Sequence, residues 1–440
     1  MIAIALALAL QDSSRLTIVD AVERALGQYP TVALARASVG RAAADVGEAR
    51  AARLPRLTFD LTGTRWDLPA IVYPLHGFPS AGGPPPGGNP VFDRTTFQGS
   101  LFANWTVLDF GARRGRVRAA RSAAVAASAA LSAAEQALAA RTATTYLRVL
   151  TARQTLAATD QRLTALRAEA DRAQQLFAEG RGPRLQVLRA DAQLARARAE
   201  RSAIAGQLDV AEHDLAQLVG LPYGALTAST LPSALLRDSS AVDRAAELQR
   251  AQATSPELAE AARRAEAAQA AAAAARATRW PEVRVSAGLV PRGSASSDLR
   301  SEWQVGAGVS YPIYTGGQRS AQIDRAEADA RAAAEQRRLA EFNVTQAVDR
   351  AIAAVTEARA RVAALEAAVA ASDAVVMTER TALEIGSGTQ TDYLDALTDL
   401  LRERAGLIEA RHAEITARIE LARVTGALSP DFLAQHLETR

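Results

Sequence analysis

The sequence of 440 residues predicts an α+β fold, in which one plan of long helices and short strands occurs twice along the chain. Three observations favour this fold over several compact domains. Aromatic residues make up only 5% of the chain, and its alanine-rich runs suit long helices packed closely side by side better than a bulky core. The same residues recur at a fixed spacing in the two halves. The strand segments alternate apolar and polar residues, as sheets with two unlike faces do.

The chain begins with a short apolar run, 1–10, that resembles the end of a secretory signal peptide. No basic residues precede this run, so we expect the signal to be truncated. No other stretch approaches the roughly 20 apolar residues that a membrane helix needs. If the chain crosses a membrane, we therefore expect it to do so as a β-barrel.

The internal duplication is visible as matching residues at constant offsets. Tyr311 follows Trp105 by 206 positions, and the same offset pairs Gly180 with Gly386 and Gly220 with Gly426. Upstream of the strands the offset is 226, so the first copy carries a longer loop. We therefore expect a first repeat over 11–220 and a second over 221–440.

Each copy is expected to run as helix, two strands, very long helix, glycine turn and shorter helix. In the first copy these are a helix at 31–53, strands at about 57–66 and 97–108 with a Pro/Gly-rich loop at 67–95 between them, and helices at 113–179 and 184–219. In the second they are a helix at 256–279, strands at about 282–290 and 302–314, and helices at 318–385 and 389–425. At 1.5 Å per residue each of the longest helices spans on the order of 100 Å.

The strand pattern is that of transmembrane barrel strands, about ten residues long with one apolar face. Tryptophans lie at or near the expected strand ends, where an aromatic girdle would sit: Trp66, Trp105, Trp280 and Trp303. An antiparallel sheet with one wet face would give the same alternation. Four strands form neither a closed barrel nor a good core, so we expect other chains to complete the sheet.

These features resemble the TolC-like outer-membrane efflux protein family over nearly the whole chain. The resemblance rests on the order and duplication of short motifs: PRL (55–57), LDFGARR (108–114), LVG (218–220), YPIYTGGQR (311–319) and DYLDA (392–396). It implies a homotrimer whose four strands per chain form a 12-stranded barrel in the bacterial outer membrane, in contact with its lipid. The barrel would continue into a helical barrel across the periplasm. The implied partners are a periplasmic adaptor (membrane fusion) protein and an inner-membrane efflux pump or ABC exporter.

Three acids follow the second glycine turn on one helix face, namely Asp392, Asp395 and Asp399. In the family, the acids that match Asp392 and Asp395 ring the periplasmic constriction, which would favour cations. The local alternative is that Thr389 caps the helix and the acids offset its dipole. The first copy has Gln186, Arg189 and Gln193 at the equivalent places, so capping alone does not require acids.

The two glycine turns are the expected docking tips for the adaptor. They comprise Gly180, Arg181 and Gly182 in the first copy and Gly386, Ser387 and Gly388 in the second. Any helical hairpin favours glycine at such a position, so the structural and functional interpretations are compatible.

The sequence offers no support for an enzyme, a cofactor or a nucleic-acid partner. Without cysteine, thiolate metal sites are excluded, and the four histidines lack metal-ligand spacing. Every basic residue is arginine, and arginines alternate with acids as on solvated helix faces. The main alternative is a soluble periplasmic coiled-coil scaffold or adaptor. A second, an amphipathic lipid-binding helix protein, would explain neither the strands nor the duplication.

Overall fold

The computed structural model describes residues 15–73, 91–222, 224–226, 231–237, 241–385 and 387–439. The expected signal peptide and most of the expected Pro/Gly-rich loop lie outside the described residues. The chain forms two compact units, and each takes segments from both halves of the sequence. One unit comprises 1–38, 128–260 and 338–440, and the other comprises 39–127 and 261–337.

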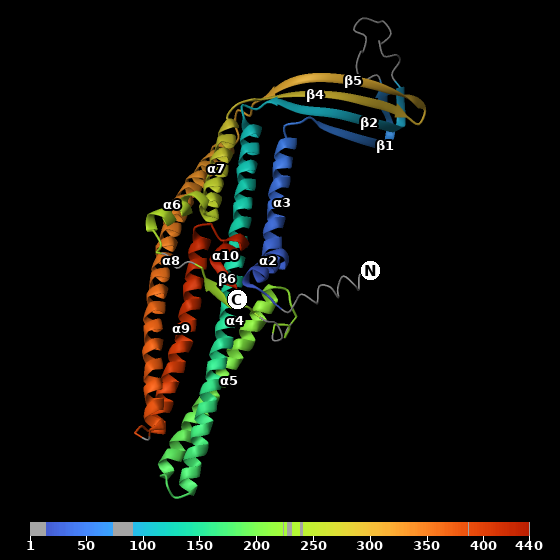
Figure 1. The fold of residues 1–440 in the computed structure, drawn as a ribbon. Coiled ribbons are helices and arrows are strands. Elements are labelled where there is room, and N and C mark those ends of the chain that lie inside the picture. The colour runs from blue at the N-terminus through green and yellow to red at the C-terminus, as the bar shows by residue number, and fades with distance from the viewer. Residues whose placement is uncertain are drawn as a thin grey trace, which may run out of the picture. The chain divides into compact units, whose positions relative to one another are not determined.

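In the part of the chain that the structure describes, eight of the helices form four pairs of equal length, one member from each half of the chain (Figure 1). The pairs are α2 (Ile18–Gln28) with α6 (Arg244–Thr254), α3 (Pro30–Ala51) with α7 (Pro256–Ala277), α4 (Ala112–Ala178) with α8 (Gln318–Glu384), and α5 (Arg184–Leu218) with α9 (Gln390–Val424). They have 11, 22, 67 and 35 residues respectively. Helices α3 to α5 and α7 to α9 lie within about two residues of the predicted bounds. The short helices α2 and α6 were not predicted.

Four antiparallel strands form one sheet in the order β1 (Arg56–Tyr73), β2 (Val91–Leu108), β4 (Glu282–Ser294) and β5 (Ser297–Ser310). The predicted loop at 67–95 is therefore wrong at both ends, because 67–73 and 91–95 belong to strands. Pro69 lies in the register shift between Arg65 and Ala70, where the regular pairing of β1 with β2 is interrupted. The last strand ends at Ser310 rather than at 314. Pro312 follows this end, and it has no N–H to offer a ladder.

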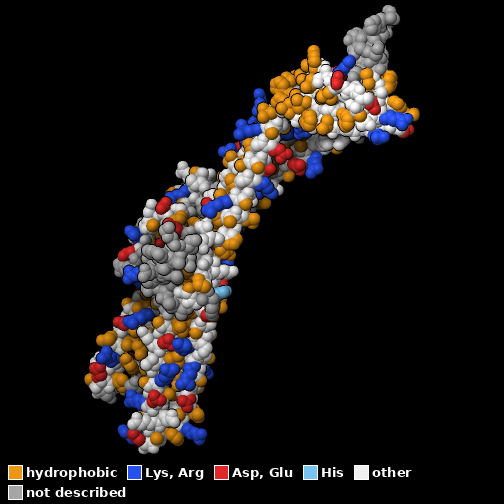
Figure 2. Space-filling view, turned by 90° about the vertical axis from the view of Figure 1, so that its right-hand side faces the viewer, with side chains coloured by type: hydrophobic (Ala, Val, Ile, Leu, Met, Phe, Trp, Pro, Cys, Tyr) orange, Lys and Arg blue, Asp and Glu red, His pale blue; other side chains and the backbone are white. Residues whose placement is uncertain are grey.

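The register places most of the apolar residues of the four strands on the same face of the sheet. Along one row Phe59 pairs with Leu101, Leu101 with Leu289, and Leu289 with Trp303. Most of these side chains are exposed in a single chain, with Trp303 77% and Phe59 69% accessible. Figure 2 shows the resulting hydrophobic surface.

Phe102 is a bulky residue in the middle of β2 that breaks the alternation, and the opposite strand explains why it is tolerated. Phe102 pairs with Gly288 of β4. A Cβ built on Gly288 would lie 2.3 Å from Cε1 of the Phe102 ring. The ring therefore covers the space that glycine leaves on the polar face, a packing that sheets use to compensate for interior glycines.

The largest hydrophobic core lies in the first unit, where α2, α4, α5 and α9 meet. A short sheet of β3 (Ala234–Leu236) and β6 (Leu437–Thr439) and the helix α10 (Pro430–His436) cover it. Tyr146 is fully buried there, and its hydroxyl lies 2.9 Å from the carbonyl oxygens of both Leu16 and Pro232. These small elements were not predicted, since each is too short to carry a periodic pattern.

Among the described residues, α4 is the one helix that is long and apolar enough to cross a membrane by length and composition. Its best 18-residue window has a mean hydropathy of 1.3 and is 22% buried. This corrects the expectation that no later stretch approaches a membrane helix. Alanine supplies most of that hydropathy, and alanine-rich core helices of water-soluble proteins meet the same criterion, so the finding alone does not place α4 in a membrane.

Candidate functional site

The first hairpin, α4 and α5, turns through a backbone motif that requires glycine. Gly180 has φ +72°, its N–H donates to Phe177 O, and Arg181 N donates to Leu176 O at 2.8 Å. These two bonds form a Schellman motif, which satisfies the last carbonyls of α4. A Cβ on Gly182 would approach Leu176 Cβ to 3.2 Å, so this glycine also fits closely against the helix end.

The second hairpin, α8 and α9, turns in the same way at the described positions. Ser387 N donates to Ala382 O at 2.9 Å, which corresponds to the bond from Arg181 to Leu176 in the first hairpin. A Cβ on Gly388 would lie 2.9 Å from Ala382 Cβ and 3.1 Å from its carbonyl carbon. Gly386 lies outside the described residues. Both tips are therefore compact turns with little room for side chains at their second glycine.

The three candidate acids lie on one exposed face of α9, but their surroundings differ. Thr389 Oγ1 accepts a hydrogen bond from Asp392 N and donates one to Asp392 Oδ2 at 2.6 Å, so Asp392 also takes part in the helix cap. Asp399 forms an ion pair with Arg402 at 2.6 Å. Asp395 has no hydrogen-bond or ion-pair partner among the described residues. Asp392 therefore has the local capping role. Of the three acids, Asp395 is the one whose charge no described partner offsets.

Glu169 of α4 adds a carboxylate to this site that the sequence did not single out. Its Oε2 is buried without a hydrogen-bond partner among the described residues. Burial raises the pKa of Glu169, the nearby Arg172 lowers it, and the charge of Asp395 raises it further. The charge of Asp395 in the second hairpin thus acts on Glu169 in the first. No spacing rule could have found Glu169, because it lies 226 residues from Asp395.

The four tryptophans occupy two kinds of position. Trp105 and Trp280 lie at the helical end of the sheet, where Trp105 Nε1 donates to Arg53 O at 2.9 Å and Trp280 contacts Phe110 with ring centroids 5.5 Å apart. Trp66 and Trp303 lie inside β1 and β5, because those strands extend further than predicted. The aromatic girdle stays a prediction.

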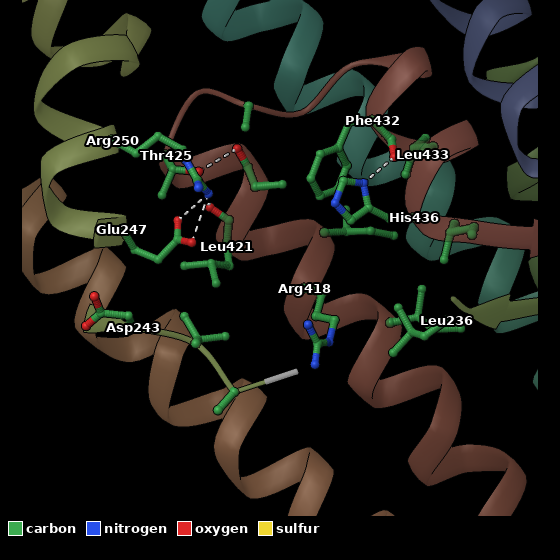
Figure 3. Close-up of a pocket in the computed structure, with 17 residues that line it drawn as sticks. Leu236, Asp243, Glu247, Arg250, Arg418, Leu421, Thr425, Phe432, Leu433 and His436 are labelled. Carbon is green, nitrogen blue, oxygen red and sulfur yellow. Dashed lines mark hydrogen bonds and ion pairs between the residues drawn. The ribbon is translucent and has the colours of Figure 1, made fainter. Parts of the chain in front are cut away.

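A cavity of about 240 Å³ lies in the first unit between α6, α9 and α10 (Figure 3). Each labelled polar side chain that lines it has a hydrogen-bond or ion-pair partner, which for Arg418 is Glu414 outside the lining. Arg250 pairs with Glu247 at 2.8 Å, and His436 Nδ1 lies 2.9 Å from Phe432 O. Its lining shows no paired nucleophile and base, and the described residues hold no cluster of three or more metal-ligating side chains.

Comparison with known proteins gives one family. The family model described as "Outer membrane efflux protein" matches residues 21–221 and 248–427. A curated relative, the outer membrane efflux protein BepC of Brucella suis biovar 1, is 25% identical over 420 residues, which covers 95% of this chain and 87% of the relative.

Solved structures show the same fold. A membrane protein from Pseudomonas aeruginosa superposes with a TM-score of 0.77 at 24% identity, over 93% of each chain. The outer membrane protein VceC from Vibrio cholerae superposes with a TM-score of 0.76 at 20% identity, over 93% of this chain and 96% of that one. At these identities the likeness concerns the fold alone.

Proposed function

The chain belongs to the outer membrane efflux protein family, and on that premise we propose that it is the exit duct of a tripartite efflux or type I secretion system. It is an outer-membrane efflux channel that extends into the periplasm. In this proposal it conducts passively the substrates that an inner-membrane pump or ABC exporter delivers through a periplasmic adaptor. The observation that carries the proposal is a sheet with one continuous apolar face, since such a face is stable only against lipid or another apolar surface.

The proposed active form is a homotrimer. In a single chain the edges of β1 and β5 have no strand partner among the described residues. Open edges do not occur in the hydrocarbon region of a bilayer, because unpaired backbone groups cost several kcal/mol each. Three chains would pair β5 of one with β1 of the next and close a 12-stranded barrel. A soluble scaffold with this sheet would expose a large apolar surface to water, so that alternative is not favoured.

The proposed constriction is a ring of acids at the second hairpin, built from Asp392, Asp395 and, more weakly, Asp399. Support comes from their shared exposed face and from the electrostatic coupling of Asp395 to Glu169. Three chains would bring nine carboxylates together, which raises the local cation concentration and binds multivalent cations. The proposed adaptor contacts are the two hairpin tips, at Gly180, Arg181 and Gly182 and at Gly386, Ser387 and Gly388.

Reversal potentials in a salt gradient across a planar bilayer test the ring directly. Replacing Asp392 and Asp395 by asparagine should remove most of the cation preference and weaken block by multivalent cations about tenfold or more, because the local field falls. Asp399→Asn serves as a matched control and should have a smaller effect, because Arg402 already offsets that charge. Unchanged selectivity in the double variant would refute the ring while leaving the channel intact.

A further inference from the structure

Three arginines form an exposed stripe at the start of α4, and we call Arg114, Arg118 and Arg121 the arginine stripe. Their spacing of four and three residues places them on one helix face. All three are exposed. The sequence contains no acid between Asp109 and Glu135, so nothing along this part of the helix neutralises them.

The stripe is unfavourable for the helix itself. The amino-terminal end of a helix carries partial positive charge, so Arg114 in the first turn repels the dipole. Arg118 and Arg121 lie beyond that turn, and the three like charges repel one another at their spacing of four and three residues. Arg113 differs, because it pairs with Asp109 at 2.7 Å. The three stripe residues have no hydrogen-bond or ion-pair partner among the described residues. Unfavourable charges that no other residue of the chain offsets are typical of a functional surface.

The second copy of the plan shows that the fold does not require these charges. At the offset of 206 residues, Arg114, Arg118 and Arg121 correspond to Ser320, Asp324 and Glu327 of α8. Helix α8 has the same length as α4 and also follows a strand of the sheet. The basic stripe is therefore a property of the first copy alone.

The stripe begins directly beside the apolar face of the sheet. Arg114 follows Leu108, the last residue of β2, by six positions, and the stripe extends about 10 Å along the helix. The aromatic pair Phe110 and Trp280 lies at the same junction. Figure 2 shows basic side chains gathered next to the hydrophobic surface of the sheet. A bilayer's headgroup layer is roughly 5–8 Å thick on each side of its hydrocarbon core, so a layer that begins at the edge of the apolar face would reach the first arginines of the stripe.

We propose that the arginine stripe binds the phosphate groups of anionic glycerophospholipids in the periplasmic leaflet of the outer membrane. The inference rests on the proposed membrane orientation of the sheet. Guanidinium groups bind phosphate oxygens in a bidentate manner, and basic clusters beside a membrane segment attract anionic headgroups. In the trimer, nine arginines would form a collar that fixes the depth of the barrel in the bilayer.

Quenching of tryptophan fluorescence by brominated lipids tests the proposal, because Trp280 and Trp105 lie at the same junction. The protein is reconstituted in mixtures of brominated phosphatidylglycerol and phosphatidylcholine, and the relative affinity for the anionic lipid is measured. Replacing the three arginines by glutamine should lower that preference about fivefold per charge removed. Replacing them by lysine should retain most of it, since the charge remains.

A control removes three exposed arginines elsewhere, Arg167, Arg196 and Arg198, also to glutamine, and should leave the preference unchanged. Equal loss in the control, or no loss in the stripe variant, would overturn the proposal. Competition by inorganic phosphate at equal concentration would show a free-phosphate site instead of a lipid site. A changed reversal potential with unchanged lipid preference would place the stripe in the conduit. Wild-type protein that conducts without lipid preference refutes only this proposal, whereas failure to insert refutes the proposed function as well.

Discussion

At the scale of single residues, the buried histidine His412 shows how α9 is fixed to α4. Thr151 Oγ1 donates to Leu147 O at 2.9 Å, so its single proton is used. His412 Nδ1, 2.6 Å from the same Oγ1, must therefore carry the hydrogen and donate it. Burial lowers the pKa of His412 to about 4. The imidazole is neutral in the folded protein at neutral pH.

His412 makes stability depend on pH in a defined window. Its pKa is about 4 when folded and about 6.5 when unfolded, so the unfolded chain binds more protons between these values. Stability is full above pH 6.5 and falls by about 3 kcal/mol as the pH drops to 4. Thermal unfolding of the detergent-solubilised protein, followed by circular dichroism across this range, should show the loss. The loss of stability should be much smaller in the His412→Gln variant. It should be undiminished in His213→Gln, a control at an exposed histidine. Equal losses in the wild type and both variants would contradict the assignment to His412.

At the scale of elements, close approach of alanine-rich helices replaces bulky packing. Helices α4 and α7 meet at Gly115, where an added Cβ would lie 2.8 Å from Ala274 Cβ and 3.1 Å from its Cα. Arginine–carboxylate pairs then bridge the helices within each hairpin, such as Arg162 with Glu200 and Arg404 with Asp373. Because these pairs are exposed or partly exposed, each contributes little, and the backbone approach sets the spacing.

Substitution of Gly115 tests this approach. Gly115→Ala should destabilise the protein by about 1–3 kcal/mol, because the new methyl group meets the backbone of Ala274. Gly40→Ala in α3 is the matched control, since nothing lies within 4 Å of its added Cβ. The control should stabilise by up to about 1 kcal/mol through helix propensity. Denaturant unfolding midpoints compare the two variants. Similar changes in both would show that the contact at Gly115 does not set the distance between α4 and α7.

At the scale of the whole molecule, two features of the sheet remain unsatisfied in one chain, the apolar face and the strand edges. Asp60 of β1 and Glu302 of β5 lie on the polar face of the two edge strands. The chain contains no cysteine and no lysine, so introduced cysteines would be the sole side-chain targets for a thiol cross-linker.

Cross-linking through these edges tests the trimer. A variant with Asp60→Cys and Glu302→Cys, treated with bismaleimides of increasing length in membranes, should give dimers and trimers and no larger species, because three chains close the barrel. Each single-cysteine variant should give at most dimers. A ladder beyond three chains would contradict closure at twelve strands, and a purely monomeric product would contradict edge-to-edge assembly.

The sequence alone determined the long helices and the faces of the strands. The bounds of α4, α5, α8 and α9 lie within one or two residues of prediction, because helix propensity and glycine caps act over a few neighbouring residues. The alternation of β2 and β4 was likewise readable, since the period of two needs no partner. Spacing on one helix also sufficed to predict that the three acids of α9 share a face, while their role at a constriction stays a prediction.

The tertiary structure alone decided what depends on partners distant in the chain. Strands β1 and β2 run past the predicted loop ends because a neighbouring strand supplies hydrogen bonds that compensate for Pro69 and polar residues. The exception at Phe102 makes sense only opposite Gly288, and Glu169 feels the charge of Asp395 only because α4 passes near α9. The short elements α2, α10, β3 and β6 are stabilised by the largest core, and α6 by a separate cluster around Val344 and Val348, rather than by their own sequences.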